Sequence, residues 1–271
     1  MRTIAVIARK GGSGKTTVAV HLAIAAHLRG RRVLLGDSDP QRSSSVVLKS
    51  RRGPGPTVIE TTGTKLFALQ VSALRSEIDT FLIDTAAGAE EDVAHAIVLA
   101  DLSLLVIRPT FLDFAAAIRT AEVLRRLHKP GLIVLNQAPV SRAGAEPPLV
   151  KKAHEALRLM RLPVAPTILR SRAAYQSALE HGCSVEELST PSPASEEVAG
   201  LWSFVERLTY GRAAAPCPSA EVASAPLPRQ ARLVGGEASG DQPSRQDNDN
   251  VVDVAVGLGI GDQIVWPQPV A

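Results

Sequence analysis

The sequence predicts a doubly wound α/β fold, in which a mostly parallel sheet carries helices on both faces. Short β-branched runs alternate with longer helical patterns from Arg2 to about Tyr210, which is the order of βαβ units. Apolar residues make up 45% of the chain and aromatic residues only 3%, so Ala, Val, Leu and Ile must build the core. That composition suits buried parallel strands covered by Ala-rich helices.

Each element follows from the periodicity of its apolar residues. Strands are expected where short runs are rich in Val, Ile and Leu, at residues 3–8, 32–36, 66–71, 80–84, 102–107 and 132–136. Helices are expected where the apolar spacing lengthens, at residues 15–29, 90–99, 114–128 and 149–160. The order of these segments gives one domain over residues 1–210 and shows no internal repeat.

The composition changes after Tyr210. Residues 211–250 are dominated by Ala, Pro, Ser, Gly, Gln, Asp and Asn, so a disordered tail is expected over residues 211–271. Residues 251–271 regain apolar residues and Trp266, and they could be a docking segment or simply tail. The tail carries 4 basic and 7 acidic residues, against 26 and 20 in residues 1–210. A modestly basic folded part is compatible with nucleic-acid contact without requiring it.

Cysteine usage and hydropathy indicate the compartment. Cys183 and Cys217 have neither metal-ligand nor redox spacing, so a reducing compartment is expected. The longest apolar stretch, residues 97–107, is interrupted by Asp101 and is too short to span a bilayer. A glycine-rich turn begins at Lys10 and leaves no room for a secretory signal. We therefore expect a soluble, cytoplasmic protein that does not bind a membrane.

The glycine-rich turn after the first strand has the chemistry of a phosphate-binding loop. It consists of Lys10, Gly11, Gly12, Ser13, Gly14, Lys15, Thr16 and Thr17. Its glycines let backbone N–H groups turn toward an anion, and the helix that follows adds its positive end. Lys15 can reach the terminal phosphates, and the Thr16 hydroxyl can join a Mg²⁺ shell. The usual pattern G-x-x-x-x-G-K-[ST] is not met, because Arg9 stands where its first glycine belongs.

The extra lysine at the entrance of this loop is the informative departure. With Lys10, the loop resembles the deviant Walker A motif of the ParA/MinD family of dimerising ATPases, which are P-loop NTPases. The resemblance implies that the chain binds ATP with Mg²⁺ and forms a homodimer on ATP. It further implies that Lys10 reaches the partner subunit's nucleotide and compensates charge there, much as an arginine finger does.

Two acidic segments match the same family. Residues 36–41 resemble its D-x-D-P-Q switch, which implies that Asp39 orders the attacking water or the metal shell and that Asp37 supports the site. Residues 80–88 form an apolar strand that ends at Asp84, the position of a Walker B aspartate that holds Mg²⁺. Ala86 and Ala87 stand where the family often has prolines, which puts the timing of catalysis in doubt.

Three later segments match the family more weakly. Residues 107–113 resemble its P-x-x-L-D turn, although Asp113 could equally be the N-cap of a helix that begins at Phe114. Asn136 stands where the family recognises adenine, and a plain turn residue is an equal alternative. Residues 168–182 resemble a late basic element, which makes Arg170 and Arg172 candidates for DNA contact, with Lys151 and Lys152 also possible.

The resemblance implies a weak ATPase whose dimer binds DNA without sequence preference and partitions a plasmid or chromosome. A ParB-like centromere-binding protein would stimulate hydrolysis, and the protein would associate with the nucleoid. A relative that positions other cargo or serves conjugative transfer remains open, as does a catalytically inactive scaffold. A MinD-like membrane regulator is disfavoured, because the tail is acidic and Gly-rich rather than a basic amphipathic helix. The cysteines do not suit an iron–sulfur reductase, nor do two tyrosines suit an autokinase.

Overall fold

A computed structural model describes residues 1–88, 90–141, 145–188 and 190–211. The expected tail lies outside the described residues from residue 212 onward. The strands are β1 (Arg2–Ile7), β2 (Val33–Asp37), β3 (Thr57–Glu60), β4 (Thr80–Asp84), β5 (Leu102–Ile107) and β6 (Gly131–Leu135). The α-helices are α1 (Lys15–Leu28), α2 (Ser43–Lys49), α3 (Leu66–Arg75), α4 (Glu90–Leu99), α5 (Phe111–Arg126), α6 (Pro148–Arg158), α7 (Ala173–Glu180), α8 (Val185–Leu188) and α9 (Pro193–Tyr210), and η1 (Gly63–Lys65) is a short 3₁₀ turn.

The six strands form one parallel sheet in the order β3-β2-β4-β1-β5-β6. The chain winds outward from β1 in both directions, which confirms the doubly wound α/β fold. The register pairs Asp37 of β2 with Asp84 of β4, and Asp84 with Val6 of β1. The carboxyl ends of these three strands therefore meet at one edge of the sheet, where the phosphate-binding loop begins.

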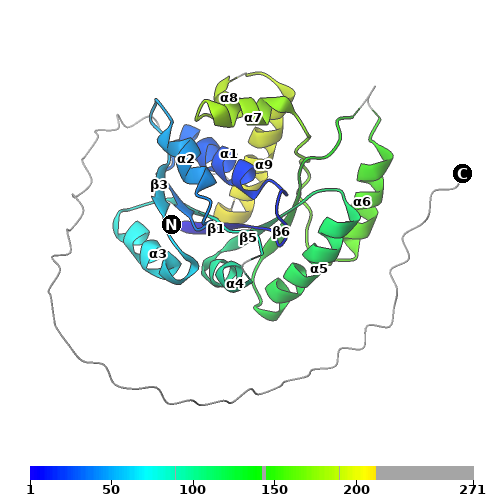
Figure 1. Cartoon of the computed structure of the whole chain (residues 1–271), viewed down its shortest axis with the longest axis horizontal. Coiled ribbons are helices and arrows are strands. Elements are labelled where there is room, and N and C mark those ends of the chain that lie inside the picture. The colour runs from blue at the N-terminus through cyan, green and yellow to red at the C-terminus, as the bar shows by residue number, and fades with distance from the viewer. Residues whose placement is uncertain (89, 142–144, 189, 212–271) are drawn as a thin grey trace, which may run out of the picture. The chain divides into compact units, whose positions relative to one another are not determined.

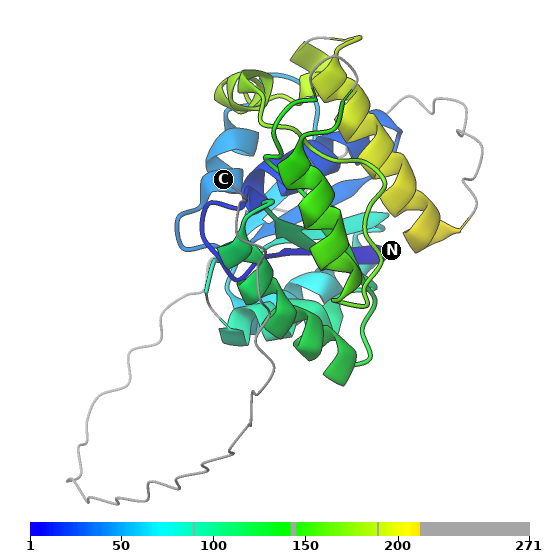
Figure 2. The same cartoon turned by 90° about the vertical axis from the view of Figure 1, so that its right-hand side faces the viewer.

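Helices cover both faces of the sheet. Figure 1 shows α1, α2 and α9 on one face, and α3, α4 and α5 on the other. Helix α1 is lined by small and branched apolar residues that are buried from Val18 to Ala26. Helix α9, yellow in Figure 2, packs on the same core through Val198, Trp202 and Val205. The phosphate-binding loop and the last described helix thus share one hydrophobic core.

One predicted strand is wrong. Residues 66–71 begin helix α3 instead, because Leu66, Gln70 and Ala73 turn toward the protein at helical spacing while Phe67 and Leu74 are exposed. The amide of Gln70 also donates to the Thr3 hydroxyl (2.8 Å). The strand that the sheet uses is β3, an edge strand of four mostly exposed residues that follows a Gly/Pro-rich turn. Its length and exposure left no buried periodicity to detect.

Helix boundaries also differ from the prediction. Helix α5 begins at Phe111, and its N-cap is Thr110, whose side chain accepts a hydrogen bond from the Asp113 N–H (3.3 Å). Asp113 is therefore not the N-cap of a helix starting at Phe114. Helices α2, α7, α8 and α9 were not predicted, and α9 is a full 18 residues long.

Candidate functional site

The loop between β1 and α1 depends on two glycines. Gly12 and Gly14 have φ of 75° and 86°, a region that favours glycine. A Cβ on Gly14 would also lie 2.2 Å from Nδ2 of Asn136. Both the backbone angle and the packing therefore require glycine at position 14, directly before α1.

Two side chains that follow β6 hold the loop from outside. Nδ2 of Asn136 donates to the Ser13 carbonyl (2.8 Å), and Nε2 of Gln137 donates to the Gly12 carbonyl (3.0 Å). In a trans peptide the next N–H points away from the carbonyl, so the N–H groups of Ser13 and Gly14 face the opposite way. This geometry fits a cradle of N–H donors for an anion. Whether Asn136 also contacts adenine stays a prediction.

Lys15 and Asp84 form the buried centre of the site. Burial lowers the pKa of Lys15, and the charges of Asp84 and Asp39 oppose that effect. Asp84 is fully buried, and neither of its oxygens has a hydrogen-bond partner among the described residues. Burial raises the pKa of Asp84 to about 7; nearby Asp37 adds to the shift, while the Thr16 hydroxyl and Lys15 counter it. A buried carboxylate that accepts no hydrogen bond at normal geometry, and has only the hydroxyls of Thr16 and Ser44 and the Lys15 ammonium nearby, is suited to a cation.

The donor set suits a magnesium ion that is also bound by phosphates. Carboxylate and hydroxyl oxygens, here those of Asp84 and Thr16, are ligands that Mg²⁺ accepts. Within the described ranges, no three His, Cys, Asp or Glu side chains are grouped so that they could hold a metal alone. A Mg²⁺ ion usually takes one or two protein oxygens and completes its shell with water and substrate phosphates. The residues present therefore fit Mg²⁺ together with a nucleotide.

The segment after β2 separates its two aspartates. Asp37 is fully buried, and its carboxylate accepts the N–H groups of Ser45 (2.9 Å) and Asp39 (3.2 Å). Asp39 is only half-buried and accepts the Gln41 N–H (2.9 Å). Asp37 thus fixes the loop that leads into α2, and Asp39 is the more exposed carboxylate, whose charge acts on Lys15. Arg42, which sequence reasoning missed, ties this loop to β3 through the carbonyls of Asp37 and Thr61.

Lys10 lies outside the buried centre. Its side chain is 38% exposed, and Nζ lies 3.7 Å from Oδ2 of Asp113 in the first turn of α5. Asp113 is 2% exposed and is bound as well by the Arg108 guanidinium, at 3.2 Å to each oxygen, and by the Thr110 hydroxyl. The two lysines of the loop therefore occupy different environments, one desolvated and one at the surface.

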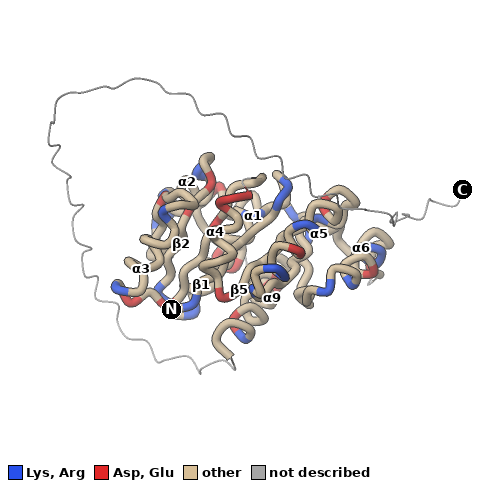
Figure 3. Tube along the Cα trace, turned by 90° about the horizontal axis from the view of Figure 1, so that it is seen from below, with Lys and Arg blue, Asp and Glu red and all other residues tan. Residues whose placement is uncertain are grey.

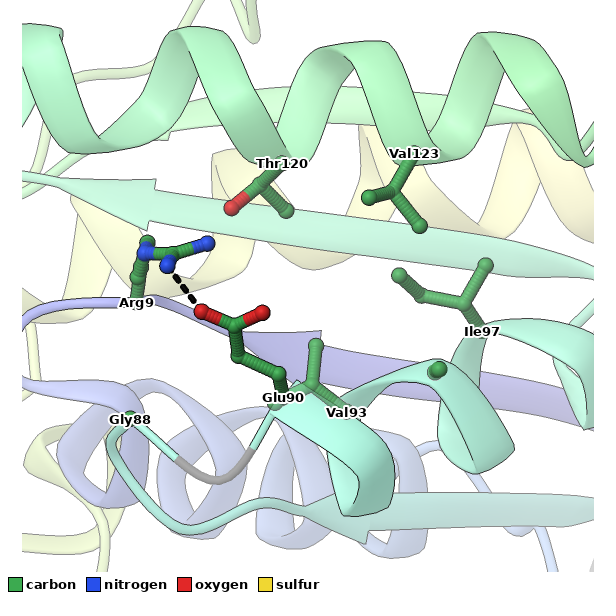
Figure 4. A pocket seen from close by; sticks show the side chains of 8 residues that line it. Arg9, Gly88, Glu90, Val93, Ile97, Thr120 and Val123 are labelled. Carbon is green, nitrogen blue, oxygen red and sulfur yellow. Dashed lines mark hydrogen bonds and ion pairs between the residues drawn. The ribbon is translucent and has the colours of Figure 1, made fainter. Parts of the chain in front are cut away.

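Arg9, the residue that breaks the usual pattern, is directed toward α4. It forms an ion pair with Glu90, and Figure 4 shows the two side chains facing each other beside Val93, Ile97 and Val123. These apolar residues line a small cavity of about 50 Å³ between α4 and α5. Arg9 therefore links the loop entrance to α4.

A second, larger pocket opens next to Thr17. Its volume is about 320 Å³, and it is lined by Asn136, Gln137, Tyr175 and the segment from Arg170 to Ala173. That size is at the lower end of pockets that hold small ligands. Thr17, the last residue of the phosphate-binding loop, lines this pocket, so the pocket adjoins the loop.

The structure brings Arg170 and Arg172 to this pocket and pairs both with carboxylates. Arg170 binds Glu146 through both Nη atoms (2.6 and 2.8 Å), and Arg172 binds Glu197 of α9 (2.7 Å). Their side chains are 12% and 24% exposed. DNA contact by these arginines stays a prediction. Neither Glu146 nor Glu197 was singled out from the sequence, because each acts at a distance of about 25 residues and carries no motif.

None of the described helices is both long enough and apolar enough to cross a membrane.

A parallel sheet with a glycine-rich loop, a buried lysine and a buried aspartate at its carboxyl edge defines a P-loop nucleotide-binding protein. The model of the CobQ/CobB/MinD/ParA nucleotide-binding domain family matches residues 4–201, and the chain belongs to this family. The match runs from within β1 to the middle of α9 and includes β2 to β6 in full.

The chain is also similar to individual members of this family. The maintenance of carboxysome distribution protein A of Gloeobacter kilaueensis is 31% identical over 194 residues, which cover 68% of this chain and 83% of that protein. The chromosome partitioning protein ParA of Caulobacter vibrioides is 48% identical over 48 residues, 18% of each chain. Among solved structures, a complex of McdA from Cyanothece with ATP has a TM-score of 0.63 at 19% identity, covering 77% of this chain and 96% of that one. The last likeness shows the fold.

Proposed function

We propose that the chain is an ATPase that dimerises on ATP, binds DNA without sequence preference and uses hydrolysis to partition or position a cargo. The observation that carries this proposal is the environment of the two loop lysines. Lys15 is buried beside Asp84, where it can serve its own nucleotide, and Lys10 is partly exposed at the loop entrance, where it can reach a second subunit.

Each residue of the buried centre has a role in this proposal. The N–H groups of Gly11 to Thr17 cradle the phosphates, and Lys15 binds the terminal ones. Thr16 and Asp84 would hold Mg²⁺, and Asp39 would join its shell or orient the attacking water. Bound Mg²⁺ neutralises charge that develops on the phosphates. Intrinsic turnover is slow in this proposal, because the half-exposed Asp39 is positioned fully only when a second subunit and a partner protein close the site.

The phosphate assignment has a direct test. Lys15→Ala removes the buried ammonium and should abolish ATP binding measured by calorimetry. Lys65→Ala, at an exposed position in η1, is the matched control and should bind like the wild type. Retention of micromolar ATP affinity by Lys15→Ala would overturn the site.

The dimer assignment is tested at Lys10. Lys10→Ala should bind ATP as a monomer, while the wild type should form dimers when ATP is added in light scattering or ultracentrifugation. Lys65→Ala again serves as the control, because it removes the same charge elsewhere. ATP-dependent dimers of Lys10→Ala would refute a role in trans.

DNA contact is best tested away from the pocket. Reversing Arg170 or Arg172 would also break their pairs with Glu146 and Glu197, so nucleotide binding would change as well. Lys151 and Lys152 of α6 are exposed, and Figure 3 shows Lys and Arg on α5 and α6. Lys151→Glu with Lys152→Glu should weaken salt-sensitive DNA binding and leave ATP affinity unchanged. Unaltered DNA retention would place the DNA surface elsewhere.

The proposal has two versions, which differ in the cargo that the protein moves. Partition of a plasmid or chromosome would require a ParB-like centromere-binding partner. The 31% likeness to a carboxysome distribution protein over most of its length favours positioning of another cargo as the alternative. The two versions are separated by measuring ATP hydrolysis with DNA and the product of the neighbouring reading frame. Stimulation by a small DNA-binding partner supports partition, and stimulation by a partner that binds no DNA supports cargo positioning.

A further inference from the structure

We propose that Glu197 is a positioning residue for the nucleoside part of the nucleotide: one carboxylate from α9 fixes three residues of the pocket beside Thr17. This inference rests on the proposed nucleotide site and goes beyond it, because Glu197 lies outside the motifs and does not line the pocket.

The pocket wall from Arg170 to Arg172 has no regular structure of its own. It follows Leu169, pairs with the segment after β6 through an isolated bridge between Ala138 and Arg170, and precedes α7. The Ser171 N–H donates to the Ala138 carbonyl (2.8 Å), and the Arg172 carbonyl accepts the Tyr175 N–H (3.3 Å). The preceding Leu169 is bonded through its N–H to the Leu135 carbonyl (3.0 Å) and through its carbonyl to the Ala138 N–H (3.1 Å). A segment with so few backbone contacts needs side chains to define its position.

Glu197 supplies those contacts through both of its oxygens. Oε2 accepts the backbone N–H of Arg170 (2.9 Å) and the hydroxyl of Tyr175 (2.8 Å). Oε1 accepts the Arg172 guanidinium through Nε (2.8 Å) and Nη2 (2.7 Å). Burial and the Glu197 carboxylate raise the pKa of Tyr175, so its hydroxyl remains a donor. All three partners of this one carboxylate line the pocket.

The carboxylate has a rigid base. Helix α9 begins with a capping box, in which the Ser195 N–H donates to the Ser192 hydroxyl (3.2 Å) and the Ser192 N–H donates to the Ser195 hydroxyl (2.9 Å). Just after Glu197, Val198 is buried in the core beside α1. Because α1 starts at the phosphate-binding loop, Glu197 sets the distance between that loop and the pocket wall.

The structure thus divides the ligand between two supports. In this proposal the loop and Lys15 hold the phosphates; among the described residues, the hydrogen bonds and ion pairs of Glu197 go to Arg170, Arg172 and Tyr175. In this proposal the wall held by Glu197 contacts what extends from the phosphates, namely the sugar and the base. Loss of Glu197 should therefore weaken a nucleotide and spare an inorganic polyphosphate.

Glu197→Gln tests this selectively. An amide has one accepting oxygen, so its NH₂ group must face either Arg172 or the paired donors of Arg170 and Tyr175. Loss of these charge-assisted bonds should weaken binding of Mg–ATP about tenfold or more, with Mg–tripolyphosphate affinity changed less than about twofold. Glu197→Asp keeps the charge and should recover part of the ATP affinity. Glu196→Gln makes the same chemical change one residue earlier, at an exposed side chain, and should match the wild type.

A second variant guards against a folding artefact. Tyr175→Phe deletes only the hydroxyl and should give a smaller loss of ATP affinity with the same selectivity. In the double variant, Tyr175→Phe should lower ATP affinity by less than it does in the wild type, because both changes remove the same hydrogen bond between Tyr175 and Glu197.

The outcomes are distinct. Equal weakening of Mg–ATP and Mg–tripolyphosphate in Glu197→Gln would overturn the positioning role and indicate a purely structural one. Unchanged ATP affinity would overturn it as well. If the wild type binds tripolyphosphate and no ATP, the proposed ATPase function fails. If the wild type binds both and Glu197→Gln gives either of the two results above, the inference fails and the proposed function stands.

Discussion

The histidine in the phosphate-loop helix predicts a measurable dependence of stability on pH. His21 is almost fully buried, and its Nδ1 lies 2.8 Å from the Thr17 carbonyl, so Nδ1 carries the proton. Its Nε2 is buried with no hydrogen-bond partner in the described structure, and the ring packs edge-on against Tyr175 (5.2 Å between centroids). A second proton would place an unpaired N–H and a charge in this apolar setting. Burial accordingly lowers the pKa of His21 to about 4.

The sign and size follow from proton linkage. Below the unfolded pKa of about 6.5, the unfolded chain binds a proton that the folded protein cannot, so stability falls as the pH falls. A shift from about 6.5 to about 4 corresponds to about 3.4 kcal/mol in full, at 1.36 kcal/mol for each pKa unit. About 2 kcal/mol of this is lost between pH 7 and pH 5. Asp84 acts in the opposite direction, because a raised carboxyl pKa makes the folded state bind the extra proton.

The contribution of His21 is therefore measured as a difference between proteins. Urea unfolding at pH 7 and pH 5 gives the loss of unfolding free energy for the wild type and for His21→Gln, in which Asp84 is unchanged. The wild type should lose about 2 kcal/mol more than the variant. His181 is the matched control, since its Nδ1 makes the same bond to a carbonyl four residues earlier (Ser177, 2.7 Å) but the ring is exposed. Equal losses in wild type and His21→Gln would refute the reasoning.

Three further predictions concern the loop and its supports. Gly14→Ala should cost about 1–2 kcal/mol from its positive φ alone and should abolish ATP binding in calorimetry, whereas Gly53→Ala, in open space, should bind normally. Asp37→Asn can no longer accept both N–H groups and should lower unfolding free energy by about 1–3 kcal/mol; an unchanged urea midpoint would contradict the role of Asp37. Asn136→Ala should weaken tripolyphosphate as well as ATP, because its amide holds the Ser13 carbonyl; weakened ATP binding alone would assign Asn136 to the base.

The sequence predicted those parts of the site that each lie within one short motif. The loop from Lys10 to Thr17 and the strand ending at Asp84 need only local geometry, a parallel sheet and the chemistry of phosphate and magnesium. The edge strand β3 could not be found in the same way, since its four residues are mostly exposed and its pairing with β2 supplies its stability. Residues 66–71 were wrongly predicted as a strand, because a short apolar run fits a strand as well as one face of a helix.

The arginines show why the rest could not be predicted. A basic pair such as Arg170 and Arg172 fits a DNA surface when only the sequence is known, because the sequence does not reveal the carboxylates that face it. In the structure, Glu146 and Glu197 approach from segments 24 and 25 residues away and turn both guanidinium groups into parts of a pocket wall. An exposed basic residue without a partner is the better candidate for phosphate contacts, because its charge is not already compensated. DNA binding is therefore tested by changing Lys151 and Lys152. The contribution of the pocket wall to nucleotide binding is tested by changing Glu197, which pairs with Arg172.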